Sequence, residues 1–481
     1  MRKIKNFVNG KFLEPEGEGK YEIYNPAEGK VIATVPEARR EDIDDAVDKA
    51  WEAQLKWSKV PITDRIKFLF KLENIMWDEI DDLAKVTTIE HGKTFEESKG
   101  DIIRAIQNVE SAAAATYHIM GENNRNIARD VDEELIRVPL GVFGIISPFN
   151  FPVMIPFWFI PYAIAMGNTV VVKPSEKTPM SMERSMEMIK KSGIPDGVVQ
   201  LVNGGGEAVN FMLENKKISG ISFVGSTPVA KYVYEKGVSN GKRVQAGASA
   251  KNFVMVMPDA DLDSNMSNMI GSFFGNAGER CLAGSVLVTL PENHDIVIKK
   301  FEEAAKKLKV GNGLESGTDM GPLIRKDHME RVKEYIASAE KEGGKIILDG
   351  RKIDMKGKEG FFLGPTIIDN VLPNMKVAKE EIFGPVASVM TANDFDEAID
   401  IINSSRYGNA STIYTTSGHY AREYTERVQA GNIGINIGVA APIAFYPFSG
   451  LKESFFGDLH PQGGKDHILF FTERKVIISK W

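Results

Sequence analysis

The stretch Thr169-Val170-Val171-Val172-Lys173-Pro174-Ser175-Glu176 predicts a core strand of the fold. Its β-branched residues favour a buried strand, and the proline ends that strand. Around it, short apolar runs alternate with amphipathic segments. The expected strands are 142–147, 197–202 and 220–225, and the expected helices are 181–192, 208–214 and 228–236. This alternation predicts an α/β fold with a doubly wound parallel sheet.

The chain has 481 residues, which exceeds one ordinary core, so two or three domains are expected. Residues 41–117 predict helices at apolar spacings of three and four. A second α/β series begins near residue 252, with helices expected at 295–307 and 328–341. The apolar strand expected at 470–479 is typical of a terminal strand that pairs with another subunit.

Charge and hydropathy exclude some classes of partner. The chain has 59 Lys and Arg against 66 Asp and Glu, a net charge of −7, and no basic stripe, so nucleic acid is not an expected partner. The most apolar segment, 143–165, contains Asn150 and several prolines and does not predict a membrane span. No apolar signal core follows the basic residues 1–5, so we expect a cytoplasmic protein without a membrane partner.

Polar residues follow the predicted strands at their carboxyl ends, where parallel sheets bind ligands. Lys173 can donate to a ribose hydroxyl, and Glu176 can accept from the 2′ and 3′ hydroxyls while repelling a 2′-phosphate, which favours NAD over NADP. Ser226 can offer its hydroxyl and a helix N-terminus to a phosphate. Taken alone, a solvated loop and an ordinary helix cap remain open alternatives.

Cys281 is the only cysteine of the chain, so it can form neither an intramolecular disulfide nor a multi-cysteine metal site. Small neighbours would let a substrate approach, and the adjacent Arg280 favours the thiolate. An inert buried cysteine is the alternative, and on this residue alone it is the more common one. Asn150 lies between aromatic residues and prolines, so it is either an oxyanion donor or a turn-stabilising residue.

Together these motifs resemble the aldehyde dehydrogenase superfamily over nearly the full length of the chain, in the family's order and spacing. The matching motifs are Pro148-Phe149-Asn150-Phe151-Pro152, Gly167-Asn168-Thr169, Lys173-Pro174-Ser175-Glu176, Phe223-Val224-Gly225-Ser226, the run Phe274 to Cys281, Gly321-Pro322, Gly364-Pro365-Thr366 and Glu381-Ile382-Phe383-Gly384-Pro385. The resemblance implies that Cys281 is the nucleophile and that Asn150 and the Cys281 backbone N–H bind the oxyanion. The residues implied in NAD binding are Ser147, Phe149, Lys173, Glu176, Lys177, Ser226, Glu381 and Phe383. No metal is implied.

The same resemblance implies a division of the chain. Residues 1–119 and 139–247 are expected to form an NAD-binding domain, and residues 248–430 a catalytic domain. Residues 120–138 and 458–481 are expected to form a small β arm for oligomerisation, and residues 431–457 to return to the cofactor domain. Members of this kind are dimers or tetramers, so a homo-oligomer is expected.

Gly247 narrows the expected reaction. Most hydrolytic members of the superfamily carry a glutamate four residues before the lysine at Lys251, which activates water, and this chain has Gly247 there. Without that base water is a poor attacker of a thioester, whereas a thiol is intrinsically more nucleophilic. CoA is therefore the expected acyl acceptor.

One subfamily shares this feature, the CoA-acylating methylmalonate-semialdehyde (malonate-semialdehyde) dehydrogenases, and the chain resembles it most closely. In that subfamily two arginines bind the carboxylate of a small aldehyde acid, and they fall on Arg104 and Arg280. Phe253 and the pair Ala248-Ser249 depart from the subfamily pattern. A hydrolytic dehydrogenase for another carboxylated aldehyde and a non-catalytic nucleotide-binding protein remain the alternatives.

Overall fold

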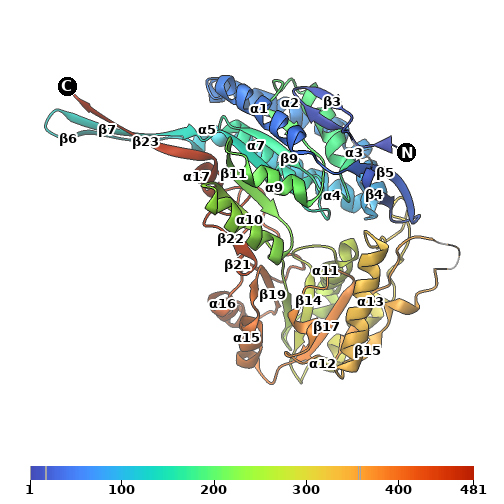
Figure 1. The fold of residues 1–481 in the computed structure, drawn as a ribbon. Coiled ribbons are helices and arrows are strands. Elements are labelled where there is room, and N and C mark those ends of the chain that lie inside the picture. The colour runs from blue at the N-terminus through green and yellow to red at the C-terminus, as the bar shows by residue number, and fades with distance from the viewer. Residues whose placement is uncertain (1, 17–18, 356, 358) are drawn as a thin grey trace.

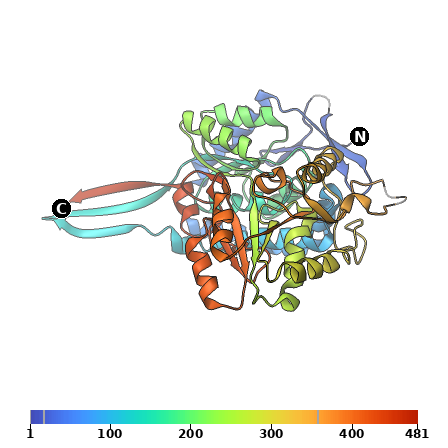
Figure 2. The same cartoon turned by 90° about the horizontal axis from the view of Figure 1, so that it is seen from below.

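The computed structural model describes residues 2–16, 19–355, 357 and 359–481. It consists of two α/β units and a long projecting arm (Figure 1). In that view the first unit lies above the second, and the C-terminus lies at the tip of the arm. Seen from below, the arm extends well away from both units (Figure 2). The predicted α/β class is confirmed.

The first unit is built on an eight-stranded sheet in the order β22-β12-β11-β8-β9-β10-β2-β3. Its parallel strands are β8 (Val142–Ile146), β9 (Thr169–Lys173), β10 (Val199–Leu201), β11 (Ile218–Val224) and β12 (Arg243–Gly247). Its antiparallel edge strands are β2 (Asn6–Val8), β3 (Lys11–Leu13) and β22 (Phe455–Phe456). The strand order reverses between β8 and β11, as in doubly wound sheets.

Helices cover both faces of this sheet, and for this reason its central strands β8 and β9 are buried along their whole length. In β8, Val142 and Ile146 belong to the core under α1 (Arg40–Trp57), α9 (Gly206–Glu214) and α10 (Thr227–Ser239). Phe143 and Ile145 belong to the core on the other face. That face is covered by α2 (Ile62–Asp78), α3 (Ile80–His91), α4 (Phe95–Ala113), α7 (Ile160–Ala165) and α8 (Met180–Lys191).

Smaller elements complete the first unit. A three-stranded sheet near the N-terminus contains β1 (Arg2–Lys3), β5 (Lys30–Pro36) and β4 (Gly19–Asn25). The short helices are α5 (Ala115–His118), α6 (Met154–Phe157) and α17 (Asp466–Phe471). The helical region predicted at 41–117 corresponds to α1 to α5, with boundaries that agree within a residue.

The second unit has a seven-stranded sheet in the order β15-β16-β17-β14-β13-β19-β20. The strands are β13 (Asn252–Val256), β14 (Gly284–Thr289), β15 (Lys345–Leu348), β16 (Thr366–Asp369), β17 (Val386–Thr391), β19 (Ala410–Tyr414) and β20 (Asn432–Ile435). The helices are α11 (Leu262–Phe274), α12 (His294–Ala305), α13 (Lys326–Lys341), α14 (Lys376–Lys379), α15 (Phe395–Ser404) and α16 (Gly418–Arg427). Two 3₁₀ turns, η1 (Gly275–Gly278) and η2 (Gly350–Lys352), and the pair β18 (Tyr407–Gly408) and β21 (Leu451–Lys452) complete it.

The arm is a three-stranded antiparallel sheet of β6 (Glu122–Ala128), β7 (Val131–Pro139) and β23 (Thr472–Lys480). In this arm β7 pairs with the C-terminal strand β23, and β6 pairs with the other edge of β7. The strand expected at 470–479 begins two residues later, because Phe470 and Phe471 end α17 and are buried in the first unit.

Two expected boundaries differ from the structure. Residues 431–457 were expected to return as a block to the first unit, but β20 pairs in parallel with β19 in the second sheet. Residues 458–481 were expected to form only the arm, but α17 packs against α7 and buries Ile468 in the first core. Both differences arise because pairing partners distant in sequence decide which core a short apolar segment joins.

Candidate active site

A cavity of about 270 Å³ lies between the two units, at the carboxyl ends of β8 and β11. Asn150 follows β8 and Ser226 follows β11, so the cavity lies where the strand order reverses, the position at which open parallel sheets bind ligands. The predicted site residues that it brings together are Phe149, Asn150, Lys177, Ser226, Cys281, Glu381 and Phe383. Lys173, Glu176, Ser147, Arg104 and Arg280 do not line it.

Cys281 follows a tight turn that only certain residues can form. Asn276 and Ala277 adopt φ values of 54° and 51°, in the left-handed region, and Gly278 follows with φ of 73°. A Cβ on Gly278 would lie 2.2 Å from the Gly384 carbonyl oxygen, so this position requires glycine. Asn252 Nδ2 and Asn409 Nδ2 each donate to the Cys281 carbonyl at 2.9 Å. Cys281 is thus held through its backbone carbonyl.

The electrostatic setting of Cys281 differs from the sequence expectation. Burial, together with the negative charge of Glu381, raises the pKa of the Cys281 thiol to about 12, although the side chain keeps one partly exposed face. Arg280 lowers this pKa as expected, but its influence is smaller than that of burial. Cys281 is therefore a protonated thiol at neutral pH. The sequence predicted a thiolate, and this prediction is corrected because burial of the side chain outweighs the positive charge of Arg280.

Asn150 lies in the same cavity and is 3% exposed. Its Nδ2 donates to the Glu279 carbonyl at 3.2 Å, which connects the turn after β8 with the loop that precedes Cys281. A primary amide has two N–H donors, so the second one remains for a group that enters the cavity. The position and donor capacity of Asn150 suit an oxyanion site beside Cys281.

Glu381 lines the same cavity as Cys281 and is held by the backbone, because its Oε1 accepts from Ala250 N at 2.9 Å. Burial raises the pKa of this carboxyl. Lys251 lies nearby with an Nζ that is buried and has no hydrogen-bond partner, and burial lowers the pKa of this amine to about 7. Burial therefore shifts the pKa of both groups in the direction that favours the neutral form.

Two residues of α13, His328 and Arg331, also line the cavity, and sequence reasoning missed them. His328 Nε2 lies 2.7 Å from the Phe383 carbonyl oxygen, which indicates that Nε2 carries the proton and donates. Burial lowers the pKa of His328 to about 4, so the ring is neutral. Phe383 itself has a φ of 59°, and its ring packs edge-on against Phe149 at 5.8 Å. No sequence motif marks either helix residue.

The residues after β9 form the second part of the expected cofactor site. Lys173 is buried, donates through Nζ to the Gly204 carbonyl at 2.9 Å and lies 3.8 Å from Glu176. Ser226 occupies the N-cap of α10, but its side chain makes no capping hydrogen bond. Ser147 Oγ is buried without a partner. Free hydroxyls at strand ends and a helix N-terminus suit a dinucleotide with a pyrophosphate.

The expected carboxylate-binding arginines are not assembled in the cavity. Arg280 donates through Nη2 to Glu97 Oε1 at 2.9 Å and through Nη1 to the Gly271 carbonyl at 3.3 Å. Arg104 donates to Gln107 Oε1 at 3.1 Å, about two turns further along α4 from Glu97. Both guanidinium groups thus lie next to α4, but each is already hydrogen-bonded to a side chain of this helix.

Gly247 ends β12 beside the cavity residues Ala248 and Ser249. A Cβ at Gly247 would meet Val224 Cγ2 at 3.4 Å, which is ordinary contact, and its φ is not positive. The backbone therefore accepts a side chain here, and the absence of a carboxylate is not imposed by packing. Among the described residues, no group of His, Cys, Asp and Glu has the arrangement of a metal site.

None of the described helices is long and apolar enough to cross a membrane. The model of the "Aldehyde dehydrogenase family" matches residues 12–477. Malonate-semialdehyde dehydrogenase 2 of Oceanobacillus iheyensis is 44% identical over 481 residues, covering 100% of this chain and 99% of that protein. Malonate-semialdehyde dehydrogenase of Bacillus pumilus is 45% identical over the same length, again covering 100% of this chain and 99% of that protein.

Solved structures agree with this fold. The crystal structure of methylmalonate-semialdehyde dehydrogenase from Oceanimonas doudoroffii has a TM-score of 0.98 at 39% identity and covers 100% of this chain and 99% of that chain. A structure described as a methylmalonate-semialdehyde dehydrogenase from Sinorhizobium meliloti complexed with NAD has a TM-score of 0.98 at 38% identity, covering 100% of this chain and 98% of that chain. The family match over almost the whole chain and the relatives at full length establish that this chain belongs to the aldehyde dehydrogenase family.

Proposed function

We propose that this chain is an NAD-dependent, CoA-acylating dehydrogenase of methylmalonate or malonate semialdehyde. The products are propionyl-CoA or acetyl-CoA, NADH and CO₂. The observation that carries this proposal is Gly247, which leaves the position of the hydrolytic carboxylate empty although the backbone accepts a side chain there. The names of the full-length relatives and of the solved structures support the substrate class.

Cys281 is the nucleophile in this proposal. Its thiol releases its proton to solvent, the sulfur forms a bond to the aldehyde carbon, and the electron pair of the carbonyl π bond moves to the oxygen, which becomes an oxyanion. The free N–H of Asn150 and the backbone N–H of Cys281 stabilise that oxyanion, an effect worth about 3–4 kcal/mol per donor in other sites. Loss of a hydride from the same carbon leaves a thioester on Cys281.

NAD, when bound, supplies the hydride acceptor. Ser147, Phe149, Lys173, Glu176, Lys177, Ser226, Glu381 and Phe383 are the residues that we assign to its site. The unpartnered Oγ of Ser147 and the uncommitted side chain of Ser226 at the N-terminus of α10 support the assignment. Lys177 lies 4.8 Å over the Phe149 ring and adds a positive charge to the cavity wall.

Arg104 and Arg280 bind the substrate carboxylate in this proposal. Guanidinium groups match carboxylates bidentately and stay charged, but both must first leave their local partners, Gln107 and Glu97. Loss of the carboxylate as CO₂ breaks the bond to the α-carbon, and the electron pair left there takes up a proton. The thiolate of CoA then attacks the thioester and releases Cys281.

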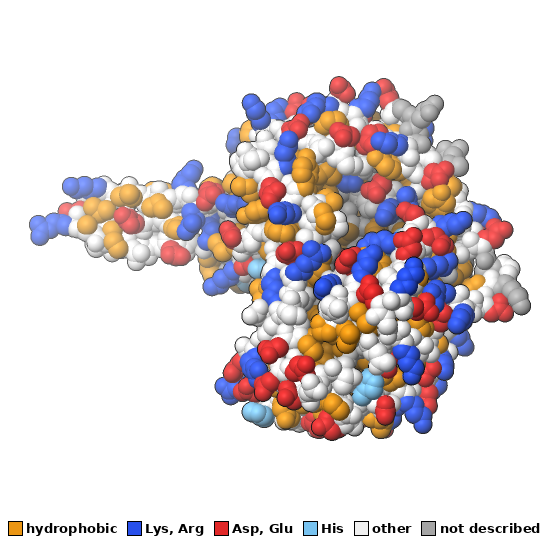
Figure 3. Space-filling view, turned by 60° about the horizontal axis from the view of Figure 1, so that its bottom comes forward, with side chains coloured by type: hydrophobic (Ala, Val, Ile, Leu, Met, Phe, Trp, Pro, Cys, Tyr) orange, Lys and Arg blue, Asp and Glu red, His pale blue; other side chains and the backbone are white. Residues whose placement is uncertain are grey.

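A homo-oligomer, a dimer or a tetramer, is the proposed assembly. The arm exposes the apolar side chains of Val476 (58%) and Ile478 (67%) in β23 and of Trp481 (83%), which follows this strand. Figure 3 shows apolar side chains along the arm between charged ones. Long exposed strands of this kind need a covering partner. A reduced thiol that acts as nucleophile also suits the cytoplasm, where we propose that the enzyme acts.

The test follows NADH formation from malonate semialdehyde with and without CoA and identifies the product by mass. The expected result is turnover that requires CoA and yields acetyl-CoA. Equal turnover without CoA, with a free acid as product, would instead establish the hydrolytic alternative. Absence of NADH formation with any short carboxylated aldehyde would support a non-catalytic nucleotide-binding protein.

A further inference from the structure

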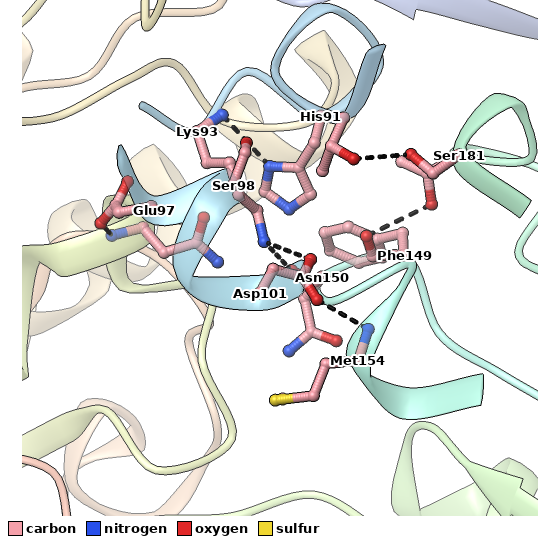
Figure 4. Close-up of polar contacts among 12 residues, drawn as sticks. His91, Lys93, Glu97, Ser98, Asp101, Phe149, Asn150, Met154 and Ser181 are labelled. Atoms are coloured by element: carbon pink, nitrogen blue, oxygen red, sulfur yellow. Dashed lines mark hydrogen bonds and ion pairs between the residues drawn. The ribbon is translucent and has the colours of Figure 1, made fainter. Parts of the chain in front are cut away.

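Behind Asn150 lies a buried lysine that the proposed mechanism does not use. Lys93 is 1% exposed and lies in the connection between α3 and α4. Its Nζ donates to the backbone carbonyl of Asn150 at 2.7 Å and lies 4.2 Å from the centroid of the Phe151 ring. Figure 4 shows the Lys93 side chain directed at the Asn150 carbonyl, next to Asp101.

Asp101 of α4 completes a bridge under the same turn. Its Oδ2 lies 3.3 Å from Lys93 Nζ, and both side chains are fully buried. Its Oδ1 accepts from Met154 N at 2.7 Å, at the start of α6 (Figure 4). The pair therefore holds the segment 150–154 at both ends, the first end through Lys93 and the second through Asp101.

A buried ion pair is a poor source of stability, because desolvation of two charges offsets most of their attraction. Burial lowers the pKa of Lys93, and the negative charge of Asp101 acts in the opposite direction. The pair instead fixes the orientation of the backbone at Asn150. A buried donor at 2.7 Å constrains the peptide plane after Asn150, and with it the direction of the Asn150 side chain.

The opposite side of Asn150 is also fixed. Its Nδ2 donates to the Glu279 carbonyl, two residues before Cys281. Glu97, one turn before Asp101 on α4, accepts from the backbone N–H of Asn276 in the same loop. The first two turns of α4 thus connect to both loops whose relative position sets the distance between the Asn150 amide and the reacting carbon.

We propose that Lys93, held by Asp101, is the positioning residue for the oxyanion-binding amide of Asn150. This inference rests on the proposed function, in which Cys281 attacks an aldehyde and Asn150 binds the resulting oxyanion. A displacement of about 1 Å at such a site can lower turnover about 100-fold, so the pair acts on kcat rather than on substrate affinity.

The test compares Lys93→Met with Asn150→Ala and with the double variant that combines them. Lys93→Met removes the donor to the Asn150 carbonyl, and Lys93→Met with Asp101→Asn also removes the carboxylate left without its partner. Lys242→Met is the matched control, because Lys242 is another buried lysine that donates to two carbonyls, of Asn215 and Ile218, at the opposite end of the sheet. Each variant is assayed for NADH formation from malonate semialdehyde and propanal and for thermal unfolding.

A second readout separates positioning from general damage. Alkylation of Cys281 by iodoacetamide needs the sulfur but forms no tetrahedral oxyanion. We expect Lys93→Met to lower kcat about 10- to 100-fold, to leave the alkylation rate within about twofold, and to add no loss in the Asn150→Ala background. Lys242→Met should turn over like the wild type.

Three results would overturn the inference: wild-type turnover of both Lys93 variants, a parallel loss of alkylation, or losses from Lys93→Met and Asn150→Ala that multiply. Wild-type turnover of Asn150→Ala has a different meaning. It would show that Asn150 does not bind the oxyanion, so the proposed role of Asn150 would fail first and this inference with it. Impaired Asn150→Ala beside unimpaired Lys93→Met would refute the inference alone.

Discussion

The two sides of Cys281 are organised differently. On the Asn150 side, Lys93, Asp101 and Met154 form buried contacts that are already complete. On the Arg280 side, the guanidinium group is partly exposed and is paired with Glu97 of the same protein. In the proposed function, the groups for the chemical step are therefore preorganised, whereas a group for substrate selection, Arg280, is engaged with another side chain. A substrate carboxylate must compete with a protein carboxylate.

The largest expected effect is the pH dependence of the reaction of Cys281 with an alkylating reagent, which tests the burial of this side chain. Because burial raises the pKa of its thiol to about 12, only a small fraction is thiolate at neutral pH. Alkylation by iodoacetamide should rise about tenfold per pH unit, and therefore about 1,000-fold between pH 6 and 9, without a plateau. A plateau near pH 8 would show that Arg280 or another cation lowers the pKa of the thiol more than burial raises it. The contrast drawn between the two sides of Cys281 would then be wrong.

Arg280→Gln tests the open side. Removal of a charged pair to a carboxylate should raise the KM for malonate semialdehyde about 10- to 100-fold with little change for propanal, because the uncharged aldehyde has no carboxylate to bind. Steady-state kinetics with the two substrates measures this ratio. Equal losses for both substrates would place Arg280 in the loop structure before Cys281 rather than in substrate recognition.

Gly247→Glu introduces, on the preorganised side, the carboxylate that hydrolytic members of the superfamily carry at this position. The position accepts a Cβ without a clash, so the variant should fold and should increase NADH turnover in the absence of CoA about 10-fold, through general-base activation of water. Gly247→Gln, which has the same size without the base, is the matched control. A similar gain in both variants would attribute the effect to packing.

Glu97→Gln produces the smallest expected effect and tests the competition directly. Glutamine can keep its amide oxygen on the Thr94 backbone N–H, as in the capping box, but its NH₂ group then accepts neither from Arg280 nor from the Asn276 N–H. The KM for malonate semialdehyde should therefore fall about two- to fivefold, with the KM for propanal unchanged. A rise in the KM for the charged substrate would mean that Glu97 orients Arg280 for binding and does not compete with the substrate.

Local sequence patterns predicted much of the fold. The β-branched run at 169–172 and the helices of residues 41–117 agree with the structure. The prediction was wrong for β20 and incomplete for α17. These segments are short and apolar, and several cores can bury such segments equally well, so composition does not decide between them.

For the site, motifs at strand ends identified residues that the fold does bring together, among them Asn150, Ser226, Cys281 and Glu381. His328 and Lys93 had no such signal, because a helix and a connecting loop place them in the site from distant parts of the chain. The state of Cys281 was also beyond the sequence. A neighbouring arginine is visible in the sequence, but the desolvation that outweighs it comes from packing.

The sequence by itself determined the class of fold, the single cysteine and the glycine at position 247, because these depend on residue type and local periodicity. The tertiary structure decided which of the candidate groups share one cavity, the protonation of Cys281, and the pairing of Arg280 with Glu97. Distances and dielectric surroundings are properties of residues brought together from remote segments, and electrostatic interactions depend on both.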